Sequence, residues 1–281
     1  MRRPNLFIVG AGRSGTTTLY EWLKQHPDVF MSEVKGPNFF GEEPNPAFKE
    51  FHKNEKKYLS LFAKAGNKKI LGEASHYFWS ETAPKEIKKF NPEAKIIILL
   101  RHPMEIAYSY YKNGDIPNNI PFEESINLNT EDLKKMWEKL KFSRNLKNYL
   151  DAFGKKNVNI IFLDEMEKNP EKVYSVLCDF LRIDNRHPIK FEIHNKSRDL
   201  KNKWFLWVLE KLPTGFKLFL KSIIPKGKIN KMRKSAINFT TQRQRKYSLK
   251  PDIRKKLNNR FKKEILVTGK FIGKDLSHWL K

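Results

Sequence analysis

The stretch from Leu6 to Leu23, LFIVGAGRSGTTTLYEWL, constrains the fold more than any other part of the sequence. It opens with four apolar residues rich in β-formers, which predict a short buried strand that ends at Gly10. Three glycines and three threonines are found next, and Leu19, Trp22 and Leu23 then recur at helical spacing. A strand, a glycine turn and a helix in this order direct free backbone N–H groups and the positive end of a helix dipole at an anion.

The side chains of this turn suit the oxygens of a phosphate or a sulfate. Glycine lets the backbone approach a ligand closely, and threonine hydroxyls add neutral donors. Arg13 lies inside the turn and adds a fixed positive charge with a planar fork of N–H groups. The turn is therefore predicted to be a phosphate-binding loop.

Three kinds of loop fit this pattern. Gly10, Gly12 and Gly15 match the G-x-G-x-x-G of dinucleotide enzymes. The G-x-x-x-x-G spacing of nucleotide-triphosphate loops is also present, although Thr16 stands where that motif needs lysine. The phosphosulfate loop of sulfotransferases carries a basic residue in the turn and hydroxyls after the last glycine. A plain βα turn is a fourth alternative, but it requires neither Arg13 nor three threonines, so a second site has to decide.

Strand and helix patterns alternate along the chain, which indicates an α/β fold with a P-loop-type parallel sheet flanked by helices. Strands are expected at 6–9, 29–31, 70–73, 95–101 and 157–163, and helices at 17–24, 48–63, 103–110, 146–153 and 173–181. The run Ile96 to Leu100 is fully apolar and is therefore expected inside the sheet. We expect residues 1–198 to form the core, and 199–281, a basic helical C-terminal appendage, to complete the same domain.

Arg101 marks a second anionic site. It ends the most apolar strand, at the sheet edge where open α/β sheets bind ligands, and Ser109 is eight residues further on in the next helix. Nucleotide triphosphatases usually end this strand in a carboxylate that holds magnesium. Arg101 and His102 present positive charge instead, which favours a second phosphate and disfavours a metal site. Taken alone, Arg101 is also compatible with an ordinary surface arginine.

The two motifs together, VGAGRSGTTTLYEWLKQHPDVFM and LLRHPMEIAYSYY, resemble the sulfotransferases that use 3′-phosphoadenosine 5′-phosphosulfate (PAPS). The heparan-sulfate-type enzymes and their bacterial relatives are the most similar subgroup. The similarity continues through GEASHYF, FLDEMEKNPEKV and DLSHWL. It implies PAPS as the cofactor, no metal, Arg101 and Ser109 as ligands of the 3′-phosphate, and a loop for the 5′-phosphosulfate made by Gly12, Arg13, Ser14, Gly15, Thr16 and Thr17.

Transfer of a sulfuryl group requires cations for the leaving phosphate and a base for the proton of the acceptor. Arg13 replaces the lysine that is common at this place in the family; it keeps the charge but does not readily give up a proton. Lys35 is the second candidate cation, and a solvated loop lysine is its alternative role.

The catalytic base is not evident from the family pattern. Gly36 stands where many relatives carry the glutamate that acts as base. Three substitutes are available: Glu33, Glu73 and His76. His76 is the best candidate, because the ordinary pKa of histidine suits a general base near neutral pH. A structural role is the alternative for His76, and Glu73 could instead orient a neighbour. An acceptor amine that arrives deprotonated would also reduce the need for a base.

The chain carries 56 Lys and Arg against 31 Asp and Glu, a net charge of +25, so a polyanion or an anionic surface is an expected partner. Residues 200–235 contain nine lysines, Arg233 and a single acid, Glu210, interleaved with aromatic residues. This composition is typical of a basic amphipathic segment, expected as two helices, at an anionic membrane surface. The alternatives are a helical cap that packs on the core and a segment that binds a polyanionic sugar chain. Nucleic acid is not expected, because no recognition module is evident.

The remaining features bound the protein class. Cys178 is the only cysteine, which excludes an intramolecular disulfide framework, and its apolar surroundings predict a core position. No apolar run approaches the roughly 20 residues that span a bilayer, so we expect a cytoplasmic protein that is soluble or peripheral to the membrane. The expected acceptor is a glycan, a glycolipid or a small molecule. A P-loop kinase-like phosphotransferase and a non-catalytic nucleotide- or glycan-binding module are the alternative functions.

Overall fold

A computed structural model describes residues 2–192, 198–200, 241–243 and 251–280. The chain divides into two compact units, one of residues 1–194 with 250–281 and one of residues 195–249. In the smaller unit, β6 (Arg198–Leu200) pairs with β7 (Thr241–Arg243) in antiparallel register. The two helices expected over 200–235 lie outside the described residues, apart from Leu200 in β6.

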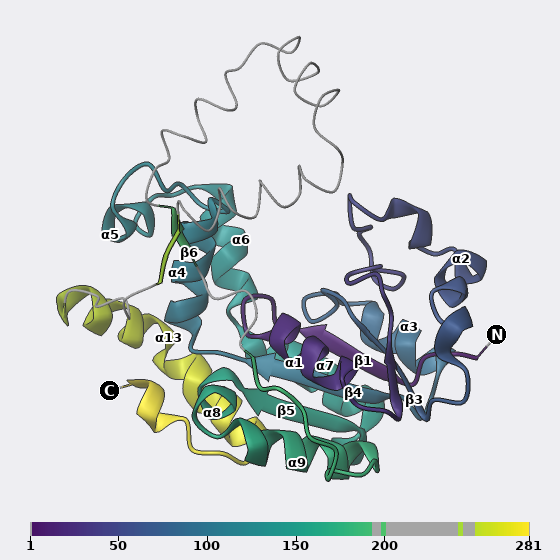
Figure 1. Cartoon of the computed structure of the whole chain (residues 1–281). Coiled ribbons are helices and arrows are strands. Elements are labelled where there is room, and N and C mark those ends of the chain that lie inside the picture. The colour runs from purple at the N-terminus through teal and green to yellow at the C-terminus, as the bar shows by residue number, and fades with distance from the viewer. Residues whose placement is uncertain (1, 193–197, 201–240, 244–250, 281) are drawn as a thin grey trace. The chain divides into compact units, whose positions relative to one another are not determined.

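The larger unit is built on a parallel sheet of five strands, in the order β2-β3-β1-β4-β5 (Figure 1). The strands are β1 (Leu6–Gly10), β2 (Val29–Met31), β3 (Ile70–Ala74), β4 (Lys95–Leu100) and β5 (Val158–Phe162). All four pairings are parallel, which confirms the predicted α/β class. Every residue of β1 is buried, as a central parallel strand covered on both faces requires.

Helices cover both faces of this sheet. Leu6 and Ile8 of β1 pack in one core cluster with residues of α1 (Thr16–Lys24), α8 (Leu163–Lys168) and α9 (Pro170–Leu181). Phe7 points to the opposite face and meets the ring of Phe40 at 5.7 Å between centroids. That face is also covered by α3 (Ala83–Phe90) and α7 (Phe142–Phe153). The alternation along β1 therefore supplies two apolar layers, one to each side of the sheet.

The segment expected as one helix at 48–63 is divided into shorter pieces. A 3-10 turn, η1 (Lys49–Phe51), precedes α2 (Glu55–Ser60), and a second turn, η2 (Ala63–Ala65), follows. Lys53 takes a left-handed φ of 53° that interrupts a helix. Asn54 then caps α2, because its side chain accepts a hydrogen bond from the N–H of Lys57 at 3.1 Å.

The remaining helices of the larger unit follow β4 or close the chain. After β4 come α4 (Pro103–Asn113), α5 (Phe122–Ser125), α6 (Glu131–Lys139) and then α7. The long helix α13 (Pro251–Ile272) packs against α7 and α4 and is followed by the turn η4 (Ser277–Leu280). In the described part of the chain, no helix is both long enough and apolar enough to span a membrane.

Candidate functional site

The glycine loop between β1 and α1 is shaped by two positions that have no room for a side chain. A Cβ on Gly12 would lie 2.9 Å from the Cη2 atom of Trp79. Gly15 has φ +90°, and a Cβ there would lie 2.7 Å from a methyl group of Leu163. Glycine is therefore required at both ends of the turn that leads into α1.

The loop has unsatisfied hydrogen-bonding capacity. Ser14 is fully buried, and its Oγ atom has no hydrogen-bond partner among the described residues. Gly15, at the N-cap of α1, offers no side-chain cap to the N–H groups of the first helical turn. Buried polar atoms normally have partners, so the geometry suits the oxygens of an anionic group placed on the loop.

Arg13 and Arg101 meet at this edge of the sheet. Arg101 follows the last residue of β4, and its guanidinium donates to the main-chain oxygen of Arg13 at 3.3 Å. It also pairs with Glu105 at 2.8 Å, one helical turn before Ser109 on α4. The exposed Arg13 pairs with Asp115 at 2.9 Å. The loop and the end of β4 thus form one positively charged edge, with a carboxylate beside each arginine.

Lys35 is brought to the loop by the turn that follows β2. Its half-buried side chain donates a hydrogen bond from Nζ to the hydroxyl of Thr17. Burial lowers the pKa of Lys35, while the nearby charge of Glu21 acts in the opposite direction. The half-buried ammonium lies directly on the loop, so the alternative of a solvated surface lysine does not hold.

His76 lies on the other side of the loop, after β3. Its Nδ1 atom is 3.7 Å from the position that a Cβ of Gly12 would take. The residue as a whole is exposed to solvent. Desolvation, followed by the charges of Lys35, Arg13 and Lys139, lowers the pKa of His76. The imidazole is therefore neutral at neutral pH and able to accept a proton.

A family model described as "Sulfotransferase domain" matches residues 3–269, which is nearly the whole chain. The chain belongs to the sulfotransferase domain family. It is an enzyme of this class, and the resemblance read from its two motifs is confirmed.

Curated relatives of this sulfotransferase include two mammalian proteins. Human bifunctional heparan sulfate N-deacetylase/N-sulfotransferase 1 is 25% identical over 203 residues, covering 66% of this chain and 22% of that protein. The mouse protein of the same name numbered 4 is 33% identical over 113 residues, covering 39% and 13%. The chain therefore spans less than a quarter of the length of these relatives.

A solved structure shares the fold. The crystal structure of a sulfotransferase from Alicyclobacillus acidocaldarius superposes with a TM-score of 0.71 at 23% identity, over the whole of both chains. This similarity supports the fold, a parallel sheet flanked by helices.

Two other acids were candidates for the base of this sulfotransferase. Glu33 is 69% exposed in its side chain and lies beside Lys64, at 3.8 Å. Glu73 is fully buried in β3, and both of its carboxylate oxygens accept hydrogen bonds from hydroxyl groups. Desolvation raises the pKa of Glu73 to about 6, against the effect of those hydrogen bonds. Neither acid has a described contact with the loop, which leaves His76 as the accessible candidate.

Two residues of the site were missed by the sequence analysis. Trp79 lies against Gly12, and its indole N–H donates to the main-chain oxygen of Lys139 at 2.7 Å. Asp115 pairs with Arg13 across 102 residues of sequence. A signal for Trp79 existed, since it follows the GEASHYF segment of the family resemblance, but no local pattern marks Asp115.

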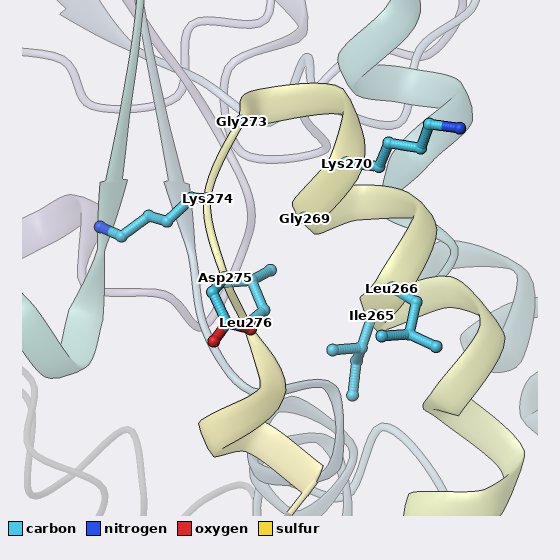
Figure 2. A pocket seen from close by; sticks show the side chains of 8 residues that line it. All are labelled: Ile265, Leu266, Gly269, Lys270, Gly273, Lys274, Asp275 and Leu276. Atoms are coloured by element: carbon cyan, nitrogen blue, oxygen red, sulfur yellow. The ribbon is translucent and has the colours of Figure 1, made fainter.

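A hollow of about 340 Å³ lies elsewhere in the larger unit. Figure 2 shows α13 on one side of it and the turn from Lys274 to Leu276 on the other. Its lining contains no residue of the glycine loop, of β4 or of α4. The candidate site is instead at the glycine loop, where the unpartnered Ser14 hydroxyl, Lys35 and Arg101 are found. Among the described residues, no three His, Cys, Asp or Glu side chains gather as metal ligands.

Proposed function

We propose that this sulfotransferase transfers a sulfuryl group from PAPS to a hydroxyl or amine of an acceptor, with a glycan as the first candidate and glycolipids or small molecules as alternatives. The observation that carries the proposal is the glycine loop with its unpartnered Ser14 hydroxyl, on which Lys35, His76 and Arg101 converge. The human relative is a bifunctional protein with heparan sulfate N-sulfotransferase in its name, which supports a glycan amine as the acceptor.

Each residue of the candidate site has a separate role in the proposed transfer step. PAPS supplies the activated sulfuryl group, whose bond to the phosphate oxygen breaks as a bond to the acceptor forms. Arg13 and Lys35, which donates a hydrogen bond to Thr17, stabilise the negative charge of the departing phosphate. His76 takes the proton of the acceptor, since its Nδ1 atom lies beside Gly12 and its lowered pKa favours the neutral imidazole.

The loop residues Gly12 to Thr17 bind the 5′ end of the donor, and Arg101 with Ser109 binds its 3′-phosphate. Arg101 already lies against the main chain of the loop, at 3.3 Å from the oxygen of Arg13. One ligand that carries two anionic groups can therefore contact both places, which separates this site from one for a single phosphate.

Ligand binding without magnesium tests the donor assignment. Adenosine 3′,5′-bisphosphate is expected to bind more tightly than AMP, and Arg101→Ala is expected to remove most of that preference. A charge-assisted hydrogen bond is worth about 1.5–3 kcal/mol, which corresponds to about a ten- to hundredfold change in Kd. Isothermal titration calorimetry of the wild type and the variant measures it.

The matched control is Arg144→Ala, which removes an exposed arginine that also pairs with a carboxylate, Glu81, at 2.6 Å. This control is expected to leave both affinities unchanged. Equal binding of AMP and the bisphosphate by the wild type would contradict the proposal. Magnesium-dependent turnover of ATP would favour the kinase-like alternative, and tight binding of PAPS without transfer would favour a non-catalytic module.

A further inference from the structure

Glu73 is a buried carboxylate that the proposed reaction does not use. It lies in β3, next to the central strand, and its side chain is completely inaccessible to solvent. A buried charge is costly unless it is fully hydrogen-bonded, so a carboxylate at this place calls for an explanation. Its surroundings supply one, because two of its three hydrogen-bond donors, Ser75 and Tyr77, are also bonded to the segment that carries Lys35.

Three hydroxyl groups donate to this carboxylate. Tyr58 and Tyr77 both donate to Oε1 at 2.8 Å, and Ser75 donates to Oε2 at 2.5 Å. Burial raises the pKa of both tyrosines well above the ordinary value, so the two phenols keep their protons and remain donors. The direction of these three hydrogen bonds is therefore fixed by Glu73.

Two of the three hydroxyl oxygens also accept hydrogen bonds from the backbone of one segment, residues 32–40, here called the Lys35 segment. The N–H groups of Phe39 and Phe40 donate to the Tyr77 oxygen at 2.9 and 3.4 Å. The N–H of Asn38 donates to the Ser75 oxygen at 3.3 Å. A hydroxyl has a single proton, and these two groups donate theirs to Glu73, so the lone pairs of their oxygens are left to accept from the backbone.

The Lys35 segment is bonded both to the glycine loop and to His76, which lies beside the loop. Lys35 donates to Thr17, and the next residue, Gly36, is fixed to the main chain of Ala74 at 2.8 Å. On the other flank, the side-chain oxygen of Asn38 accepts a hydrogen bond from the N–H of His76 at 3.4 Å. A shift of this segment would therefore move a cation and the candidate base together.

We propose that Glu73 is a positioning residue for sulfuryl transfer: through Tyr77 and Ser75 it fixes the Lys35 segment, and thereby the placement of Lys35 and His76 on the glycine loop. This inference deepens the proposed function and rests on it. Glu73 itself touches no substrate. Its contribution is to the transfer step, because positioned groups act on the transition state more than on binding of the donor.

The two tyrosines provide a matched pair of variants. Tyr58 and Tyr77 are both fully buried and donate to the same oxygen at the same distance. Of the two tyrosines, only Tyr77 has a described hydroxyl contact with the backbone of the Lys35 segment. Phenylalanine keeps the ring in each case, so Tyr77→Phe breaks the connection to the segment, whereas Tyr58→Phe removes a donor to Glu73 and leaves the segment attached.

Tyr77→Phe is expected to lower kcat about five- to tenfold, while KM for PAPS and Kd for the bisphosphate change less than twofold. The two variants are expected to lower the melting temperature by similar amounts. Tyr58→Phe should nevertheless leave kcat within twofold of the wild type. Equal loss of kcat in the two variants, or no loss in either, would overturn the proposal and leave a cluster that only stabilises the core.

Combining Glu73→Gln with each tyrosine variant tests whether Glu73 acts through Tyr77. Glu73→Gln is expected to lower kcat, and adding Tyr77→Phe to it should reduce kcat by less than twofold more. If the two effects multiply instead, Glu73 acts by another route and the proposed link is wrong. A Glu73→Gln protein that does not fold leaves the tyrosine pair as the deciding comparison.

Amide hydrogen exchange provides a readout that does not depend on activity. Exchange of the amides of residues 38–40 is expected to accelerate at least fivefold in Tyr77→Phe and to be unchanged in Tyr58→Phe. If the wild type fails to transfer sulfuryl groups, the proposed function fails while this comparison still reports the link. Unchanged exchange in both variants would overturn the link even in an active enzyme.

Discussion

His76 meets positive charge on several sides, and this environment decides what the residue can do. Desolvation and the charges of Lys35, Arg13 and Lys139 favour the uncharged imidazole and lower its pKa. A base is active in its deprotonated form. The lowered pKa therefore extends the active range of His76 to more acid pH than an ordinary histidine would allow.

Replacing His76 is expected to affect the transfer step alone. His76→Ala should lower kcat by about 10²–10⁴-fold, the usual contribution of a positioned base, and leave the Kd of the bisphosphate unchanged. In the wild type, kcat/KM for a hydroxyl acceptor should fall on acidification, with a midpoint below pH 6.5. Steady-state kinetics across pH with PAPS measures both effects.

The decisive control for the base is His76→Gln, which keeps a hydrogen-bonding side chain but cannot accept the proton. It is expected to be nearly as slow as His76→Ala. If both variants keep near-full activity, His76 is not the base. A joint loss of activity and bisphosphate binding would instead indicate a structural role.

At the scale of elements, the junction between the glycine loop and α1 restricts the residue that can stand there. Gly15 combines a left-handed φ of +90° with a neighbouring methyl group of Leu163 on α8. The turn therefore has to be glycine for two separate reasons. The same conformation directs the first N–H groups of α1 toward the candidate anion site.

Gly15→Ala is expected to lower the free energy of unfolding by about 1–3 kcal/mol, from backbone strain and the contact with Leu163. It should also weaken bisphosphate binding at least tenfold, because the loop must shift to admit the methyl group. Urea denaturation and calorimetric titration measure the two effects.

Gly66→Ala is the matched control for Gly15. Gly66 also has a positive φ, +52°, but a Cβ there would meet nothing within 4 Å. This variant should lose about 1–3 kcal/mol from backbone strain alone and bind the bisphosphate normally. Normal binding by Gly15→Ala would show that the loop shape is not essential to the site.

At the scale of the larger unit, the end of the described chain is joined to the site edge of the sheet. Trp279 is buried and packs against Phe162 of β5 and His102, each at 5.6 Å between ring centroids. The Nε2–H of His102 donates to the main-chain oxygen of Trp279 at 2.6 Å, while Nδ1 accepts from Met104 at 3.1 Å. His102 directly follows Arg101, so this packing supports the start of α4 where the 3′-phosphate is proposed to bind.

Trp279→Ala should therefore destabilise the protein and weaken the site together. Loss of a buried tryptophan typically costs about 3–5 kcal/mol of unfolding free energy. Bisphosphate affinity should fall more than AMP affinity, because the Arg101 end of the site is affected. Leu266, on α13, is 51% exposed, so the control Leu266→Ala should change the free energy of unfolding by less than about 0.5 kcal/mol. A stable Trp279→Ala protein with normal binding would contradict this role.

The sheet could be predicted from the sequence, and the glycine loop and Arg101 could be recognised as the two ends of a candidate site. Apolar runs gave all five strands to within two residues, because both faces of a parallel strand must be buried. The glycine loop and Arg101 were recognisable because each directly follows a strand, and the carboxyl ends of parallel strands share one edge. The helix expected at 48–63 was wrong as a continuous element, since the cap at Asn54 is local chemistry that an apolar pattern does not report.

The residues that surround the loop could not be predicted from the sequence and are known from the tertiary structure. Lys35 and Thr17 are 18 residues apart, Glu73 connects to Phe39 and Phe40 through Tyr77, and Arg13 and Asp115 are 102 apart. These contacts join side chains from different strands, helices and turns, and periodicity carries no information about such pairs. Whether a buried carboxylate is a base or a positioning residue depends on which hydroxyl groups surround it, and folding alone brings those groups together.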